Sequence, residues 1–423
     1  MLTINQIKNN KEEIIKKLSV RNKDFSELIN KAIEEDNNRR AIQNELDATL
    51  AKSNQIAKSI GLLFKEGKQE EANNAKQEAV QLKEKSKELS EKMNASKNNL
   101  QKILSEIPNI PHPSVPAGKT DEDNELVREG GTIPNLTKKV PHWELTSKFD
   151  IIDFELGNKI TGAGFPVYKG KGAKIQRALI AFFLDEADKA GYKEIMPPLM
   201  INEASGFGTG QLPDKEGQMY HMTEDNLFMI PTAEVPVTNI YRDVILNEED
   251  FPIKMTAYSS CFRREAGSYG KDVRGLNRLH QFDKVEIVRI SHPEKSYETL
   301  DEMVAYVETL VQKLELPYRI VRLCGGDLGF TSALTYDFEV YSAGQDKWLE
   351  VSSVSNFESF QANRLKLRYK AKGEKQTKLA HTLNGSALAL PRILAALLEN
   401  NYTEDGIKIP KVLQKYLNFD VIN

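Results

Sequence analysis

The first quarter of this sequence lacks proline and has very little glycine. All 17 prolines of the 423-residue chain lie at or after Pro108, while residues 1–107 contain two glycines and two aromatic residues. A segment without proline that is rich in Lys, Glu, Asn, Gln and Ala can form long uninterrupted helices. The chain therefore has two parts of different composition, and we predict two domains, 1–107 and 108–423.

Cysteine and long apolar runs are also scarce. Cys261 and Cys324 are too few for a disulfide framework, no Cys-x-x-Cys pair exists to hold zinc, and the six histidines show no metal-ligand spacing. No apolar run approaches the roughly 20 residues of a membrane span. Residues 1–20 mix Lys with Glu, unlike a signal or transit peptide. We expect a cytoplasmic protein without zinc and without a membrane partner.

The charges nearly balance. The chain has 58 basic and 61 acidic side chains, a formal net charge of -3, but residues 1–107 carry 20 basic and 17 acidic ones. A near-neutral total does not demand a nucleic-acid partner, although it can hide a local basic face.

Apolar residues in the first quarter follow an alternating spacing of three and four. The second half of the segment gives an uninterrupted series: Ala72, Ala75, Ala79, Leu82, Ser86, Leu89, Met93, Ser96, Leu100 and Ile103. The first half gives Leu28, Ala32, Glu35, Arg39, Ile42, Leu46, Thr49, Ser53, Ile56, Ile60 and Leu63. This spacing is typical of a coiled-coil seam, and the charged residues Glu35 and Arg39 interrupt the apolar seam in the first half.

Two helices of about 35 residues, each about 50 Å long, would follow from this pattern. The turn signals near Gly61–Gly67 favour an antiparallel hairpin over about 27–104, preceded by a short separate helix within residues 1–22. The seam contains many small side chains, so we expect modest stability. Periodicity alone leaves two purposes open: a dimerisation or spacer device, or an arm that grips a polyanion.

The pattern changes after Ile107. Pro-Asn-Ile-Pro-His-Pro at 108–113 ends the helix, and short β-like runs then alternate with helices such as 168–189. Strands are predicted at 227–230, 255–262, 285–290, 318–323, 336–341 and 347–352. Several strands follow one another directly, which favours an antiparallel sheet and an α+β fold.

The two common nucleotide-binding loops are not matched. The nearest approach to a Walker loop, Gly164 to Gly170-Lys171, has five intervening residues instead of four and Gly172 where Ser or Thr should stand. Gly162-Ala-Gly164 lacks the third glycine of a dinucleotide fingerprint. An ATP site in this chain would have to be built in another way.

The stretch 261–282 is the most informative for chemistry. Arg263 and Glu265 are two residues apart, so we expect both on one face at the end of a strand. A glycine-rich loop with Lys271, Arg274 and Arg278 follows, and a second strand returns through Phe282 to Glu286. Arginine suits bidentate recognition of phosphate or carboxylate, and an aromatic ring can stack on a base. A surface hairpin of salt bridges is the alternative.

These residues resemble a known family. Phe262-Arg263-x-Glu265 followed by Arg278-x-x-x-Phe282 resembles motif 2 of the class II aminoacyl-tRNA synthetases, and the full stretch resembles the bacterial-type seryl-tRNA synthetases. Other blocks extend the resemblance over essentially the whole chain: 191–198 resembles motif 1, 381–392 resembles motif 3, 231–234 and 350–356 are family-like, and the hairpin resembles the tRNA-binding arm.

The resemblance implies roles for individual residues. The serine-binding set is Thr232, Ala233, Glu234, Arg263, Glu286 and Ser386. The ATP-binding set is Arg263, Arg264, Glu265, Arg278, Phe282, Glu350, Val351, Ser352, Ser353 and Arg392. Arg263 and Arg392 would be catalytic, and Glu350 and Ser353 would hold Mg²⁺. Arg264 departs from the small residue common at its position, and we expect it to point to the opposite face.

The resemblance also implies an activity and partners. The protein would form seryl-adenylate from serine and ATP and transfer the seryl group to tRNA(Ser), and also to tRNA(Sec) where that tRNA exists. It would act as a homodimer with an antiparallel class II catalytic domain. Two rivals are a ligase that loads an amino acid onto a carrier protein, which the long arm argues against, and an inactive coiled-coil scaffold.

Overall fold

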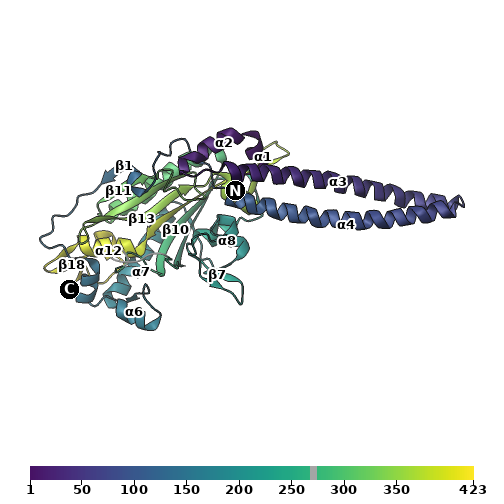
Figure 1. Ribbon diagram of the computed structural model, residues 1–423. Coiled ribbons are helices and arrows are strands. Elements are labelled where there is room, and N and C mark those ends of the chain that lie inside the picture. The colour runs from purple at the N-terminus through teal and green to yellow at the C-terminus, as the bar shows by residue number, and fades with distance from the viewer. Residues whose placement is uncertain (267–273) are drawn as a thin grey trace. The chain divides into compact units, whose positions relative to one another are not determined.

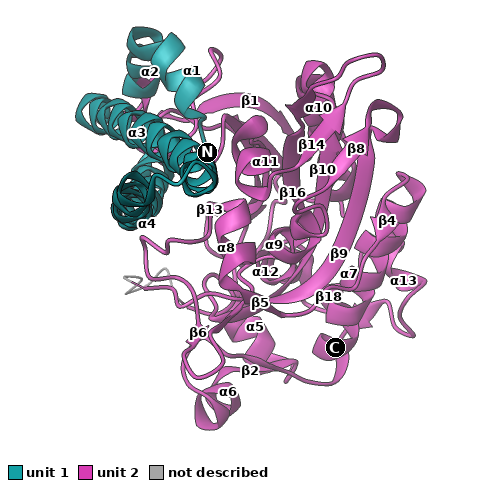
Figure 2. Cartoon of the chain, turned by 90° about the vertical axis from the view of Figure 1, so that its right-hand side faces the viewer, with its two compact units in different colours: residues 1–19, 23–108 teal, residues 20–22, 109–423 magenta. Residues whose placement is uncertain are grey.

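The computed structural model describes residues 1–266 and 274–423. The chain divides into two compact units, residues 1–19 with 23–108 and residues 20–22 with 109–423 (Figure 2). Residues 20–22 belong to the second unit because the buried Arg21 side chain donates hydrogen bonds to backbone carbonyls there, including that of Asn109 at 3.0 Å.

Two long antiparallel helices form most of the first unit (Figure 1). These are α3 (Ser26–Lys65) and α4 (Gln69–Glu106), and ion pairs such as Lys52–Glu78 and Glu45–Lys85, both at 2.7 Å, join them. The turn between the two helices contains fewer residues than the segment 61–67 that the sequence indicated. Gly61 lies inside α3, and only Gly67, with φ +75°, has the left-handed backbone that favours glycine.

All the predicted seam positions of α3 and α4 are buried or half-buried. The polar interruption at Glu35 is matched across the seam, because its carboxylate accepts hydrogen bonds from the hydroxyl of Ser96 and from Nδ2 of Asn99, the latter at 2.7 Å. Serine in the seam of α4 is therefore the partner of an acidic residue in α3, which fixes the pairing of the two helices where apolar contacts are sparse.

The start of the chain differs from the single short helix expected there. Two helices, α1 (Ile4–Asn9) and α2 (Lys11–Leu18), meet at Asn10. They are tied to α3 through Asp36, which is fully buried and lies 2.6 Å from Nζ of Lys8. Burial alone would raise the pKa of Asp36, but hydrogen bonds from Lys8, Arg39 and Arg40 outweigh it and lower this pKa to about 2.

The second unit is built on an eight-stranded sheet in the order β1-β11-β12-β13-β16-β10-β9-β4 (Figure 1). All neighbours pair antiparallel except β4 with β9, so the predicted α+β fold with an antiparallel sheet is confirmed. The strands are β1 (Glu125–Gly130), β4 (Lys193–Glu194), β9 (Ile253–Phe262), β10 (Gln281–Ser291), β11 (Tyr318–Arg322), β12 (Leu334–Ser342), β13 (Lys347–Asn356) and β16 (His381–Ala389).

Five of the six predicted strands lie in this sheet, and the sixth is β7 (Leu227–Met229) of a small separate sheet. Sequence reasoning missed the two-residue strand β4 and the longer strands β1 and β16. β1 is a mostly exposed edge strand with polar residues, and β16 contains Gly385 and other small residues, so neither has the apolar run that marks a strand.

Three longer helices pack in the larger apolar core of this unit: α7 (Gly170–Lys189), α10 (Ser296–Lys313) and α12 (Leu390–Asn400). Strand β10 shows how the sheet separates this core from the site. Val285 and Ile287 belong to the larger core, whereas Val288 and Ile290 belong to a second cluster. Because side chains alternate along a strand, Glu286 shares with Val288 and Ile290 the face of β10 that is turned away from the larger core.

The other elements of the second unit are short. The helices are α5 (His142–Lys148), α6 (Phe154–Ile160), α8 (Glu203–Thr209), α9 (Glu234–Asn239), α11 (Ser359–Leu365) and α13 (Lys411–Gln414). The strands are β2 (Ile152–Asp153), β3 (Val167–Tyr168), β5 (Met200–Asn202), β6 (His221–Met222), β8 (Ile245–Asn247), β14 (Arg368–Lys370), β15 (Thr377–Leu379), β17 (Tyr402–Thr403), β18 (Gly406–Lys408) and β19 (Val421–Ile422). In the described ranges, no helix has the length and apolar character needed to span a bilayer.

Candidate active site

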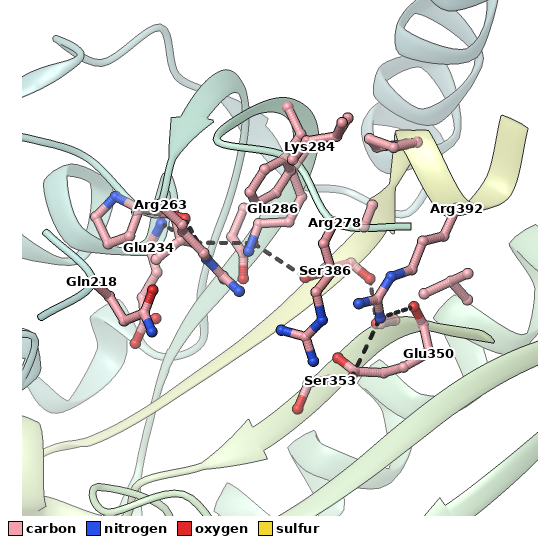
Figure 3. A pocket seen from close by; sticks show the side chains of 18 of the residues that line it. Gln218, Glu234, Arg263, Arg278, Lys284, Glu286, Glu350, Ser353, Ser386 and Arg392 are labelled. Carbon is pink, nitrogen blue, oxygen red and sulfur yellow. Dashed lines mark hydrogen bonds and ion pairs between the residues drawn. The ribbon is translucent and has the colours of Figure 1, made fainter. Parts of the chain in front are cut away.

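A cavity of about 520 Å³ gathers most of the predicted site residues (Figure 3). Its walls come from β10, β13 and β16, from the segments that follow β7 and β9, and from the first turn of α12. The predicted residues that line it are Thr232, Glu234, Arg263, Glu265, Arg278, Phe282, Glu286, Glu350, Val351, Ser352, Ser353, Ser386 and Arg392.

Glu286 is the centre of one end of the cavity and is 1% exposed. Its Oε2 atom lies 2.7 Å from Nζ of Lys284 and accepts hydrogen bonds from the hydroxyls of Thr232 at 3.2 Å and Ser386 at 3.4 Å. Its Oε1 atom is buried and has no hydrogen-bond partner among the described residues. A buried acceptor without a partner is costly, so this oxygen is suited to a donor supplied by a ligand.

The register of the sheet sets this arrangement. Ser386 of β16 is paired with Glu286 of β10, so the two side chains are cross-strand neighbours. Phe282, Lys284 and Glu286 are alternate residues of β10 that all line the cavity, and Phe282 also packs against the larger core. The hydroxyl of Thr232 accepts the backbone N–H of Glu234 at 3.2 Å, which fixes Thr232 just before α9.

Glu234 places a second buried carboxyl group at this end. It is 5% exposed and accepts a hydrogen bond from Nε2 of Gln361 at 2.7 Å. Burial, followed by the charge of Glu286, raises the pKa of Glu234 to about 7. Two carboxyl groups beside two hydroxyls form a small polar pocket that suits a ligand with an ammonium group and a hydroxyl.

Arg263 lies beside this polar end (Figure 3). Its guanidinium carbon is 5.3 Å from the ring centroid of Phe282, a cation–π distance, and its Nε donates to the carbonyl of Pro231 at 3.4 Å. One face of the Phe282 ring is thus close to a cation, and the ring lines the cavity where a flat ligand can stack on it.

Arg278 and Arg392 lie at the other end, with Glu350 and Ser353 (Figure 3). Nη1 of Arg278 donates to Oε2 of Glu265 at 3.1 Å. Nη1 of Arg392 donates to the carbonyl of Glu350 at 2.8 Å and lies 3.7 Å from its Oε2 atom. Two guanidinium groups at one end of a cavity favour a ligand with several anionic oxygens.

The backbone around Arg263 corrects one prediction. We expected a strand that continues through Arg263 and Glu265, but β9 ends at Phe262 and Glu265 has φ +48°. Both side chains line the cavity because of this turn and not because of strand alternation. Lys271, in the glycine-rich loop that follows, lies outside the described residues.

A bulge brings Glu350 and Ser353 to the same face of β13. Residues three apart on a regular strand point to opposite faces. Here Glu350 pairs with Glu339 while Ser353 pairs with Asp337, two positions along β12, so β13 contains one extra residue between them. The bulge allows a carboxylate and a hydroxyl to line the cavity together.

The oxygen atoms at this end fit a hard divalent cation. Asp337 hydrogen-bonds Ser353, and its Oδ1 atom is buried without a hydrogen-bond partner among the described residues. Burial, followed by the charge of Glu350, raises the pKa of Asp337. Carboxylate and hydroxyl oxygens are ligands that Mg²⁺ accepts, usually together with substrate phosphates. In the described residues, no group of three or more His, Cys, Asp and Glu side chains is gathered to hold a metal.

Comparison with known proteins agrees with this geometry. The model of the tRNA synthetase class II core domain (G, H, P, S and T) matches residues 219–401, and that of the seryl-tRNA synthetase N-terminal domain matches residues 1–111. The serine–tRNA ligases of Salinibacter ruber and Clostridium tetani are 48% and 45% identical to the chain, each over 99% of it and 98% of the relative.

The chain belongs to the seryl-tRNA synthetase family. Solved structures agree. Seryl-tRNA synthetase from Pyrococcus horikoshii, complexed with ATP, has a TM-score of 0.92 and 33% identity, covering 100% of this chain and 99% of the other. Cytoplasmic serine–tRNA ligase from Naegleria fowleri, in complex with AMP, has a TM-score of 0.86 and 26% identity, with the same shares. The resemblance inferred from the sequence motifs is therefore confirmed.

Two residues of the predicted sets do not line the cavity. Ala233 is fully buried between Thr232 and Glu234, and Arg264 is exposed, with its backbone N–H bonded to the carbonyl of Gln218 at 2.9 Å. The side chain of Ala233 is too short to reach past its neighbours, whereas Arg264 lies beyond the end of β9, in the turn that contains the positive φ of Glu265.

Sequence reasoning missed several polar residues that the family motifs did not single out. Lys284, Asn277 and Asn384 all line the cavity. Lys284 had a detectable signal, because it stands between Phe282 and Glu286 in an alternating run. Asn277 follows the glycine-rich loop, and no spacing rule places such a residue.

Proposed function

We propose that the protein activates L-serine with ATP to seryl-adenylate and transfers the seryl group to the 3′ end of tRNA(Ser). One observation carries the proposal: a small polar pocket with two carboxyl groups adjoins an arginine-rich end within a single cavity. Membership of the seryl-tRNA synthetase family supports the choice of substrates.

Serine occupies the end around Glu286. Its ammonium group lies between the carboxyl groups of Glu234 and Glu286, and its hydroxyl meets the oxygen of Glu286 that has no partner and the hydroxyl of Ser386. Thr232 orients Glu286, and Ala233 contributes only main chain. A pocket that hydrogen-bonds a hydroxyl rejects alanine strongly, because the buried polar partner would then be unsatisfied.

ATP occupies the arginine-rich part. The adenine ring stacks on Phe282 and its amino group donates to Glu265, while Arg278 and Arg392 hold the β- and γ-phosphates. Arg263 contacts both the α-phosphate and the serine carboxylate. Arginine suits these positions because its planar group binds two oxygens at once.

The chain brings two anions together and neutralises them. An oxygen of the serine carboxylate attacks the α-phosphorus, the bond from this phosphorus to the bridging oxygen breaks, and pyrophosphate leaves with the bonding electrons. Arg263 holds the attacking group in line, and Arg392 stabilises the charge that develops on the leaving group. In the second step a ribose hydroxyl at the tRNA 3′ end attacks the carbonyl carbon and AMP leaves.

Glu350 and Ser353 are the residues that would hold Mg²⁺ at this end of the cavity. When bound, the ion neutralises phosphate charge and polarises the reacting phosphoryl group. Val351 and Ser352, on the bulged part of β13, line the cavity between Glu350 and Ser353. Ser352 is fixed by its hydrogen bond to the carbonyl of Ser386 at 2.5 Å.

The proposal includes macromolecular partners. The helical arm of α3 and α4 binds tRNA(Ser), and tRNA(Sec) where it exists, and the second unit forms a homodimer through residues 191–198. Exposed apolar side chains support this interface, since Met196 is 89% exposed in the single chain. The cytoplasm, where tRNA and ATP meet, is the expected location. Light scattering of the purified protein tests the dimer.

ATP–pyrophosphate exchange with each amino acid in turn tests the proposed chemistry. We expect exchange with serine only. Exchange with alanine or threonine in place of serine would refute the specificity. No exchange with any amino acid would favour the scaffold, and serylation of a carrier protein without charging of tRNA would favour the carrier-protein ligase.

A further inference from the structure

A buried pair of charged and polar side chains lies behind the arginine-rich end of the cavity and has no part in the chemistry described above. His142 begins α5 and Glu399 lies near the end of α12, and both are 0% exposed. Nδ1 of His142 is 2.7 Å from Oε1 of Glu399, which also accepts the backbone N–H of His142 at 2.9 Å.

The other ring nitrogen of His142 faces the segment that closes the glycine-rich loop. The backbone N–H of Leu276 donates to Nε2 of His142 at 2.8 Å. An accepting Nε2 carries no proton, so the ring is neutral and Nδ1–H donates to Glu399. One histidine therefore links a fixed carboxylate on α12 to the backbone of a residue that lines the cavity.

The approach of this backbone to His142 is very close. Gly275 has φ +64°, and a Cβ atom built on it would lie 2.2 Å from Nε2 of His142. The His142 ring therefore limits, by steric contact, the path that the backbone of residues 275–276 can take. Glycine is required here both for its backbone angle and for the lack of a side chain.

A second set of hydrogen bonds connects Glu399 to Asn277, the residue that follows Leu276. Nε2 of Gln345 lies 3.2 Å from Oε1 of Glu399, and Oε1 of Gln345 accepts Nδ2 of Asn277 at 2.8 Å. The carbonyl of Asn277 in turn accepts Nε of Arg392 at 3.0 Å. A continuous set of hydrogen bonds therefore runs from Glu399 to the guanidinium of Arg392, and Arg278 follows Asn277 directly in the chain.

The carboxylate of Glu399 is well suited to anchor this set. Its Oε2 atom accepts the hydroxyl of Ser342 and the backbone N–H of Gly344, so both oxygens have partners. Burial alone would raise the pKa of Glu399, but hydrogen bonds from His142 and Ser342 outweigh it and lower this pKa. A satisfied buried network of this kind is rigid.

We propose that His142 and Glu399 are positioning residues for the ATP end of the site: they hold the backbone of residues 275–277 and thereby the guanidinium groups of Arg278 and Arg392. The proposal rests on the assignment of ATP to this end. The serine pocket, built from β10, β16 and the segment before α9, has no hydrogen bond to the pair among the described residues. The pair should therefore affect ATP and not serine.

Two variants of His142 separate its two hydrogen bonds. The amide of His142→Asn stands where Nδ1 stood and can reach Glu399 but not Leu276. The amide of His142→Gln stands where Nε2 stood and can accept the N–H of Leu276. Leu145→Ala is the matched control, because Leu145 is fully buried on the same helix and packs only in the apolar core.

The test is ATP–pyrophosphate exchange on the full-length protein, with ATP and serine varied separately, together with calorimetric titration of ATP alone. We expect His142→Asn to raise the KM for ATP about tenfold, as expected for a buried N–H left without its partner, and to change the KM for serine less than twofold. His142→Gln should recover most of the ATP affinity. Leu145→Ala should lower the melting temperature without changing either KM.

Equal changes in both KM values, or a loss of kcat with both KM values unchanged, would overturn the proposal and leave a purely structural pair. If the two His142 variants do not fold, Gln345→Met decides, since Gln345 is only half-buried: an unchanged ATP affinity would refute the positioning role. Failure of the proposed function is a separate result, because the unaltered protein would then show no serine-dependent exchange.

Discussion

Nζ of Lys284 lies 2.7 Å from Oε2 of Glu286, and the two side chains are 8% and 1% exposed. This ion pair occupies one oxygen of Glu286 and leaves the other without a partner in the described structure. A carboxylate in such a position is oriented by the protein while it still offers an acceptor to a ligand. The pair thus connects the packing of β10 to the recognition of the substrate.

Replacing Glu286 should affect serine and not ATP. Glu286→Ala removes both the acceptor for the serine hydroxyl and a charge next to the ammonium group, so we expect the KM for serine to rise at least about tenfold. The KM for ATP should change less than about threefold. Exchange kinetics with each substrate varied in turn provide the measurement. Equal effects on the two KM values would contradict the assignment of Glu286 to the serine pocket.

Replacing Lys284 should reveal the ion pair through stability. Lys284→Met leaves the charge of Glu286 buried without a cation, which costs about 3–5 kcal/mol when a buried pair is broken on one side. We expect the free energy of unfolding in urea to fall by an amount of this order and the KM for serine to rise. The double variant Lys284→Met with Glu286→Gln should recover most of the lost stability. Additive losses in the double variant would show that the two side chains are not coupled.

The sequence predicts part of this site, and the reasons for its limits are specific. Alternation along β10 predicts that Phe282 and Glu286 share one face. The same rule predicts that Lys284, which stands between them, lies on that face too. Glu350 and Ser353 are three residues apart, a spacing that would place them on opposite faces of a regular strand. Only the bulge in β13 brings them to the same face, and no local sequence pattern predicts that bulge. No local sequence pattern predicts the positive φ of Glu265 either.

Contacts between distant parts of the chain are harder still. His142 and Glu399 are 257 positions apart and meet only because α5 packs near α12. In the arm, by contrast, every position that the heptad spacing predicted is buried or half-buried, since the contacts of a coiled coil repeat locally. The polar partner of Glu35 could not be assigned without the pairing of α3 with α4.

The raised pKa of Glu234 predicts a pH-dependent affinity for serine. With a pKa of about 7, this carboxyl group is mostly neutral at pH 6 and mostly ionised at pH 8. Only the ionised form attracts the serine ammonium, so the KM for serine should be higher at pH 6 than at pH 8, by about tenfold if this group alone titrates. Glu234→Gln should bind serine more weakly at pH 8 and lose most of this pH dependence. A KM that falls as the pH is lowered would contradict the assignment.

The acidic end of β13 predicts a change in the requirement for Mg²⁺. Glu350→Gln should raise the Mg²⁺ concentration that gives half-maximal exchange by about tenfold, the usual scale for the loss of one oxygen ligand or its support. Glu339→Gln is the matched control, because Glu339 is the register partner of Glu350 and forms its own ion pair with Arg319. Titration of Mn²⁺ followed by electron paramagnetic resonance gives a readout independent of turnover. Identical Mg²⁺ curves for Glu350→Gln and the unaltered protein would remove Glu350 from the metal site.

A shortened arm should separate the two steps of the reaction. The ion pairs Glu45–Lys85 and Lys52–Glu78 join residues whose numbers sum to 130, so removal of 45–58 together with 72–85 takes two heptads from each helix and keeps the seam and the turn at Gly67 in register. The arm becomes about 21 Å shorter, at 1.5 Å per residue.

If α3 and α4 grip tRNA through their distal half, serine-dependent exchange should stay within about twofold, because the ATP and serine ends lie in the other unit. Charging of tRNA should fall by two orders of magnitude or more, roughly what the loss of a few phosphate contacts causes. Circular dichroism on the shortened protein checks that the remaining hairpin is helical. Full charging activity would mean that the distal arm is a spacer, the reading that periodicity alone left open.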